Sequence, residues 1–371
     1  MHGETAVGMM DRFDRFQYSW RKNQNQDGSP AGEEQYTYIN GLGFLPQTPQ
    51  QMERKKLAFS YNVLIFSILM LYLLRVSAFV PVARMLSVLG LEISVNPMTG
   101  LVTMTELTYQ VVALVCYAVY MLLPALFVIV VLRRSVAVKE LFALPYYGTM
   151  RYAMAMLIGT AFLAKLVASA CSRLLQNGGL VQTDPAFQIP AGLPATIVYL
   201  LSVTLLAAFC EEFLFRGVML QALRAFGDFV ALSVSTLLFV LVQTNLENAV
   251  YALIMGLVFG YFTLKTGSIL VPMTANFCVK ALSVFLWMMR QNLEDPLGTL
   301  VVLGVFFVLV ALSIFAFCRF VHAEHDAFQL DNRDTHLTNR TKIKCLLTNI
   351  CFWLLVALAF LENISTMELI N

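Results

Sequence analysis

Hydrophobic residues occur along this chain in blocks of about twenty, separated by short polar segments. A block of that length is what a helix needs to cross about 30 Å of hydrocarbon. The pattern therefore predicts an all-α fold, a polytopic membrane helix bundle of about 8–9 transmembrane helices. From the apolar runs, the expected spans are 58–81, 108–132, 152–172, 194–213, 228–244, 248–264, 268–289, 298–318 and 345–361.

The segments around these spans suggest four regions. Residues 1–57 are polar and Gln-rich and begin without the hydrophobic segment of a signal peptide, so we expect a mobile cytoplasmic tail. Residues 58–190 hold the N-terminal spans, residues 191–292 form a core discussed below, and residues 293–371 hold the C-terminal spans with a cytoplasmic connecting segment. The fifth and sixth spans are short and nearly adjacent, which predicts a tight helical hairpin.

Composition and charge support a membrane protein. Apolar residues make up 58% of the chain and charged residues 13%, against about a quarter charged in soluble domains. The net charge of +2 gives no indication of nucleic-acid binding. The seven cysteines show no metal-ligand spacing, so we expect no metal and no cofactor. The expected partners are membrane lipid and a peptide or another membrane protein.

Orientation follows from the distribution of lysine and arginine, which stay on the cytoplasmic side of a membrane. These residues gather before the first span and after the second, fourth, sixth and eighth spans, all on one side. The pattern predicts an integral cell-membrane protein with a cytoplasmic N-terminus. With nine spans, its C-terminus would be outside.

Ionisable residues inside apolar spans are candidate functional residues, because each costs several kcal/mol near the bilayer centre. Arg75 lies near the outer end of the first span, from which its side chain can reach the interface. Lys165 lies deeper. A partner carboxylate or backbone carbonyl is its simplest structural explanation, and a functional role is the open alternative.

The fourth span ends in two adjacent carboxylates, Glu211 and Glu212, followed by Arg216. Glu212 and Arg216 are four residues apart on one helix face, which favours an ion pair. Glu211 points about 100° away, as expected for the next residue of a helix with 3.6 residues per turn. A carboxylate left free in an apolar pocket would be suited to taking a proton from water. The alternative is that all three residues form an ordinary polar flank at the aqueous boundary.

The run Glu-Glu-Phe-Leu-Phe-Arg-Gly at 211–217 resembles the EExxxR motif of the CPBP family, also called the ABI or CAAX-protease-like family of intramembrane glutamic endopeptidases. Downstream, residues 235–243 resemble the FxxxH helix of that family, and residues 252–266 its Gly-containing span. Residues 271–276 are similar to the PxxxH run that leads into the HxxxN motif. The resemblance covers roughly residues 194–290.

The resemblance implies a role for each matching position. Glu211 would be the base that activates water, and Glu212 with Arg216 the pair that orients it. Gln243, Asn276 and Lys280 occupy the positions of the two histidines and the asparagine of the family. These six positions are the candidate catalytic residues.

Three of the six depart from the family's chemistry. An imidazole accepts and returns a proton near neutral pH, whereas the amides of Gln243 and Asn276 do not. Lys280 lies one helical turn after Asn276, so in the family's packing it would face the glutamates and keep Glu211 ionised. Such a pair would act as a polar structural lock, and breaking one partner of a buried pair costs about 3–5 kcal/mol. The four histidines all lie outside the expected spans: His2, His322, His325 and His336.

Three functions remain open from the sequence, and whether the chain is an enzyme is among the open questions. One is a proteolytically impaired CPBP-family protein that acts as a membrane binding or adaptor module. Another is an active intramembrane endopeptidase of the CAAX or bacteriocin-processing type, with amide donors at the oxyanion and a histidine such as His322 or His325 folded back from the tail. The last is a small-solute transporter that uses Lys165, the two glutamates and Lys280 as a polar pathway.

Overall fold

A computed structural model describes residues 36–39, 43–46, 48–95, 102–133, 135–145, 147–182, 189–294, 296–323, 330, 335–365 and 367–369. Helices dominate this part of the chain, and its strands form three short antiparallel pairs. These are β1 (Tyr36–Ile39) with β2 (Gly43–Pro46), β3 (Ile93–Val95) with β4 (Val102–Met104), and β5 (Leu180–Gln182) with β6 (Met367–Leu369).

The helices follow one another with short connections. They are α2 (Pro49–Ser77), α3 (Phe79–Val88), α4 (Glu106–Val131), α5 (Val138–Leu141), α6 (Tyr147–Asn177), α7 (Leu193–Leu201), α8 (Ala207–Glu212), α9 (Leu220–Arg224), α10 (Asp228–Leu241), α11 (Leu246–Thr266), α12 (Leu270–Asn292), α13 (Leu297–Ala323), α14 (Asn339–Leu347) and α15 (Ile350–Ser365). Two π-helical stretches, Ser202–Leu206 and Phe213–Met219, join α7, α8 and α9 into one continuous helix.

The structure confirms an all-α polytopic membrane bundle. In the described residues seven helices are long and apolar enough to span a membrane, or eight if α14 and α15, bent by 65°, count as one broken span. This number meets the expected 8–9 at its lower end, and one of the nine expected apolar runs is too short to span. The fifth expected span corresponds to α10, whose 14 residues rise only about 21 Å, less than the hydrocarbon thickness.

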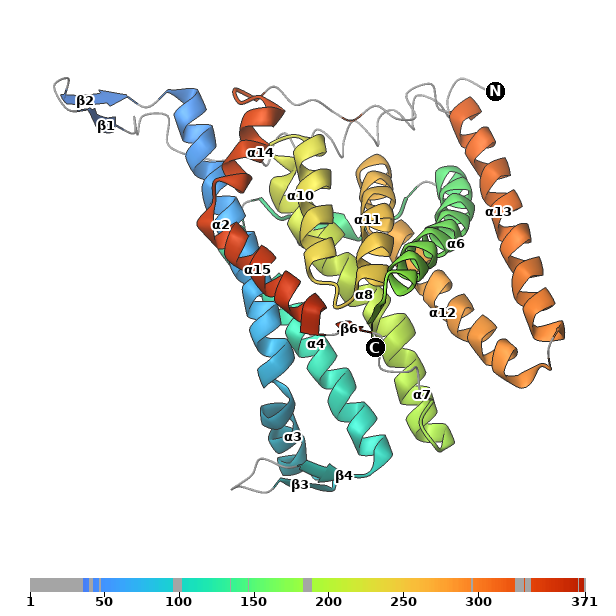
Figure 1. The fold of residues 1–371 in the computed structure, drawn as a ribbon. Helices are drawn as coiled ribbons and strands as arrows, with labels where there is room; N and C mark the ends of the chain where they lie inside the picture. Colours follow the sequence, from blue (N-terminus) through green and yellow to red (C-terminus); the bar gives the residue numbers. More distant parts are fainter. Residues whose placement is uncertain are drawn as a thin grey trace.

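Helices α10 and α11 form the expected hairpin (Figure 1), and both contact the π-helical stretch Phe213–Met219 that follows α8. Glycines of α11 allow this close packing. A Cβ atom at Gly256 would lie 2.6 Å from Cγ2 of Thr236, and one at Gly260 would lie 2.5 Å from Cδ1 of Leu232. The two helices of the hairpin are thereby held close to each other.

Arg75 of α2 caps the C-terminal end of α10. Its Nη2 donates to the Val242 carbonyl at 3.1 Å, and its Nη1 pairs with Glu362 of α15 at 3.0 Å. Tyr72 donates in the same way to the Leu241 carbonyl. The last carbonyls of a helix lack partners of their own and favour a cation. Arg75 is thus tied into the bundle by these contacts, whereas the sequence had suggested a side chain that reaches for the interface.

Gly159 marks a close contact between α6 and α13. A Cβ atom there would lie 2.2 Å from Cβ of Ser313 and 2.6 Å from the Leu309 carbonyl oxygen. We expect Gly159→Ala to push these helices apart and to destabilise the protein by about 1–3 kcal/mol. Thermal unfolding in detergent measures the effect. Gly304→Ala on α13, where a Cβ meets nothing within 4 Å, is the matched control, and equal losses for the two variants would contradict this packing.

Candidate functional site

The two glutamates lie in the middle of a long apolar helix. The continuous helix Leu193–Arg224 has 32 residues, and it extends about 18 Å beyond Glu212. The expected span ended at residue 213, which allowed the glutamates to sit at an aqueous boundary. That alternative is wrong, since Glu212 is 0% exposed and the helix continues to Arg224. A π-helical stretch follows directly after Glu212, and such turns are frequent at functional sites because they redirect side chains.

Glu212 and Arg216 form the ion pair expected from their spacing. Arg216 Nη1 lies 3.0 Å from Glu212 Oε1, and both side chains are almost fully buried. The guanidinium is also packed between aromatic rings, with its Cζ 4.2 Å from the Phe239 centroid and 5.5 Å from the Phe259 centroid. Cation–π contacts of this kind contribute to holding a desolvated arginine. The pair is therefore a structural element of the core.

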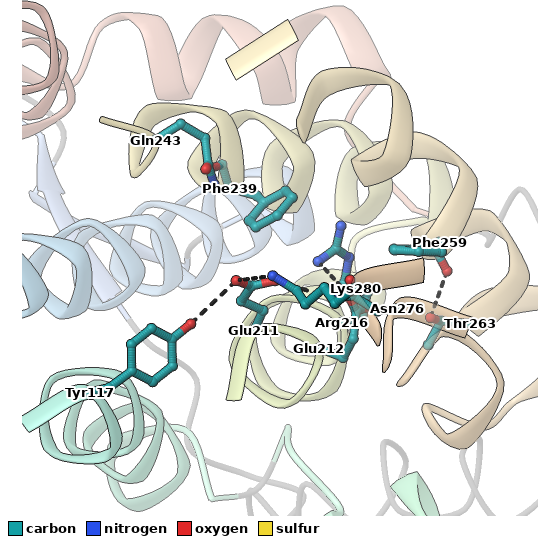
Figure 2. Close-up of polar contacts among 10 residues, drawn as sticks. All are labelled: Tyr117, Glu211, Glu212, Arg216, Phe239, Gln243, Phe259, Thr263, Asn276 and Lys280. Atoms are coloured by element: carbon teal, nitrogen blue, oxygen red, sulfur yellow. Dashed lines mark hydrogen bonds and ion pairs between the residues drawn. The ribbon is translucent and has the colours of Figure 1, made fainter. Parts of the chain in front are cut away.

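Three donors surround Glu211, as Figure 2 shows. Lys280 Nζ lies 3.1 Å from Glu211 Oε1, and the Tyr117 hydroxyl donates to the same oxygen at 3.3 Å. Asn276 Nδ2 donates to Glu211 Oε2 at 3.2 Å and to Glu212 Oε1 at 3.0 Å. The expected pairing of Lys280 with Glu211 is confirmed. Glu211 is consequently an engaged carboxylate with a cation beside it.

Gln243 takes no part in this cluster. Its side-chain Nε2 donates to the Phe239 backbone carbonyl at 3.1 Å, and the backbone carbonyl of Gln243 accepts from the Asn363 side chain at 3.0 Å. Figure 2 shows Gln243 beside Phe239, apart from the glutamates. Of the six candidate positions, the structure brings five together and leaves Gln243 outside.

Two of the four histidines fall in the described part of the chain, and neither contacts a glutamate of the site. His322 is exposed near the end of α13. His336 donates its backbone N–H to Glu53 at 2.7 Å, in the segment before α14. His2 and His325 lie outside the described residues. Within those residues, Glu211 therefore has no imidazole partner.

Sequence reasoning missed two participants. Tyr117 lies in the apolar stretch of α4, where only its hydroxyl distinguishes it from neighbouring residues. Ser283 of α12 accepts a hydrogen bond from Lys165 of α6. The sequence suggested a carboxylate or a backbone carbonyl as the partner of Lys165, and the structure gives a hydroxyl instead.

The charges of the cluster balance, since Glu211 and Glu212 face Lys280 and Arg216. Asn276 bridges the two carboxylates. The described residues place no group of three or more His, Cys, Asp or Glu side chains for a metal ion. The arrangement can hold polar groups in place by hydrogen bonds and charge. Among the described residues, the groups that contact Glu211 are an ammonium, an amide and a phenol, and none of them is an imidazole that titrates near neutral pH.

Comparison with known proteins identifies one similarity. A family model described as Rce1-like, type II CAAX prenyl endopeptidase Rce1-like, matches residues 193–282. The match runs from α7 into α12 and contains all six candidate positions. It confirms the resemblance drawn from the motifs, over about a quarter of the chain. No curated protein and no solved structure matches the chain significantly.

Proposed function

Because residues 193–282 match a family of CAAX prenyl endopeptidases, we propose that this CAAX-protease-like membrane protein is impaired as a peptidase and acts as a membrane binding or adaptor module. The supporting observation is the set of groups around Glu211. Glu211 is the carboxylate that would have to serve as base. It is in contact with the Lys280 ammonium at 3.1 Å and accepts hydrogen bonds from the amide of Asn276 and the phenol of Tyr117.

The chemistry of these groups argues against water activation. A glutamate that acts as a general base must take a proton from water and pass it on to the leaving group. The Lys280 ammonium is paired with this carboxylate at 3.1 Å, and the Asn276 amide cannot relay a proton. With the charge of Glu211 matched by Lys280, the polar cluster fixes α4, α8 and α12 to one another.

An active endopeptidase is the second candidate, and Asn276 is the observation that favours it. Its amide contacts both glutamates, a position from which it could donate to a developing oxyanion. Glu211 also keeps 18% of its side-chain surface exposed. This candidate would have to exchange protons through Lys280 or Tyr117, or through an imidazole that a substrate or a partner protein brings.

A cytoplasmic N-terminus is part of the proposal. The start of α2, the end of α13 and the whole of α14 lie at the same edge of the bundle, the upper edge in Figure 1. These segments carry Arg54, Lys55, Lys56, Arg319 and Arg340. Basic residues favour the cytoplasmic face, so we place this edge inside the cell.

A cleavage assay tests the proposed function. The purified full chain in nanodiscs is incubated with prenylated CAAX peptides and with transmembrane peptides, alongside an active CAAX endopeptidase as positive control. We expect no turnover above that of the Glu211→Ala variant. Cleavage by the unmodified protein that disappears in Glu211→Ala would show an active peptidase and end the proposal.

A further inference from the structure

Lys165 differs from the other cations buried in this bundle. Arg75, Arg216 and Lys280 each form an ion pair with a glutamate. Lys165 donates instead to the neutral hydroxyl of Ser283, and no carboxylate of the described residues lies within ion-pair distance of it. It lies near the middle of α6 (Tyr147–Asn177), where an unpaired charge is costly and marks a functional site by default.

Among the described residues, the charged groups near this cation form no ion pair with it. Glu247 of α11 and Lys280 of α12 both act electrostatically on Lys165, with opposite signs. The Glu247 carboxylate itself accepts a hydrogen bond from Ser169 at 2.6 Å. Glu247 and Lys280 thus act on Lys165 without forming an ion pair with it, and a carboxylate in direct contact with its ammonium would have to come from a ligand.

Hydrogen-bond counting leads to the same conclusion. An ammonium has three donors, and one of them is used by Ser283. The other near groups are the rings of Phe162 and Tyr251, with centroids 5.7 Å and 5.9 Å from Nζ. Aromatic faces attract a cation but accept no strong hydrogen bond. Two donors of Lys165 therefore remain for a ligand.

Near Lys165 and Ser283 in the sequence, apolar side chains lie on the outer surface of α6 and α12. Leu163, Leu166 and Val167 of α6 and Phe285 of α12 are all exposed on the surface of the bundle, where they would face lipid. A phospholipid phosphate stays at the membrane interface, about 15 Å from the bilayer centre. A ligand that reaches Lys165 must therefore carry its negative charge on a slender hydrocarbon body.

We propose that Lys165 and Ser283 form a binding subsite for a carboxylate attached to a long apolar body, namely a free fatty acid. The subsite adjoins the glutamate cluster, since Ser283 lies three residues after Lys280 on α12 and thus on the same helix face. The carboxylate accepts hydrogen bonds from the two remaining donors of Lys165, and their charges neutralise each other in a low dielectric. This inference rests on the proposed binding function and specifies the chemistry of its ligand.

Binding of matched acid and non-acid probes tests the subsite. The full chain in phosphatidylcholine nanodiscs is titrated with oleate and with oleyl alcohol, using displacement of the fluorescent fatty acid cis-parinarate. A second arm compares an apolar peptide ending in a carboxylate with its C-terminal amide. We expect about tenfold or greater preference for oleate over oleyl alcohol. A preference for the acid in the peptide arm alone would overturn the assignment to a fatty acid.

Point variants test whether the preference for the acid depends on Lys165. Lys165→Met should abolish the acid preference, Lys165→Arg should keep it, and Ser283→Ala should change it less than Lys165→Met. Lys344→Met, at an exposed position of α14, is the charge-matched control. Equal affinity for acid and non-acid in the unmodified protein overturns the subsite even if a variant fails to fold, as does an unchanged preference in folded Lys165→Met. Cleavage of the peptide probe would instead overturn the binding-module proposal and leave the subsite standing.

Discussion

Replacing Arg216 with methionine is expected to lower the free energy of unfolding by about 3–5 kcal/mol, the largest loss of any single substitution considered. Glu212 is 0% exposed, so the variant leaves a carboxylate without its cation in the bundle interior. The aromatic contacts with Phe239 and Phe259 are lost together with the charge. Asn276 remains as a donor to Glu212, but a neutral amide does not balance a buried charge.

Denaturant or thermal unfolding of the purified protein in detergent measures this loss. Arg340→Met, at an exposed position near the start of α14, removes the same charge and should change stability by less than about 0.5 kcal/mol. Combining Arg216→Met with Glu212→Gln should recover part of the loss, because the uncompensated charge is then absent. If Arg216→Met unfolds like the control, the pair is not the structural element described.

Replacing Lys280 with methionine is expected to cost about 1–3 kcal/mol. The pair with Glu211 is less buried than the first one, with side chains 28% and 18% exposed, so the loss should be smaller. Glu211 would keep Asn276 and Tyr117 as donors but lose its counter-charge. Lys280→Arg, which keeps the charge, should retain most of the stability in the same unfolding experiment. A Lys280→Met protein as stable as the unmodified one would show that Lys280 does not hold Glu211.

The helical class could be predicted from the sequence because apolar runs of membrane length are a local signal. The number of spans could not, since hydropathy treats α10 as one more apolar block. What distinguishes α10 is its short length and an end that is capped inside the bundle by Arg75 and Tyr72 of α2. Contacts between residues about 170 positions apart in the chain leave no trace in a local pattern.

In the candidate site, too, local spacing predicts some contacts, whereas others depend on how distant helices pack. The Glu212–Arg216 pair follows from i,i+4 spacing, and Lys280 follows from its position one turn after Asn276 on a helix of the resembled family. Tyr117 depends on how α4 packs against α8, so no motif signals it. Gln243 fits the spacing of the FxxxH motif, yet its side chain turns back to its own helix.

A double-mutant cycle on Glu211 and Lys280 tests directly whether Lys280 holds the Glu211 carboxylate. Unfolding free energies are measured for the unmodified protein, Glu211→Gln, Lys280→Met and the double variant. We expect a coupling of about 1–3 kcal/mol, with the double variant more stable than the sum of the single losses implies. Strictly additive losses would contradict it, because they would mean that the Glu211 carboxylate is not bound to Lys280.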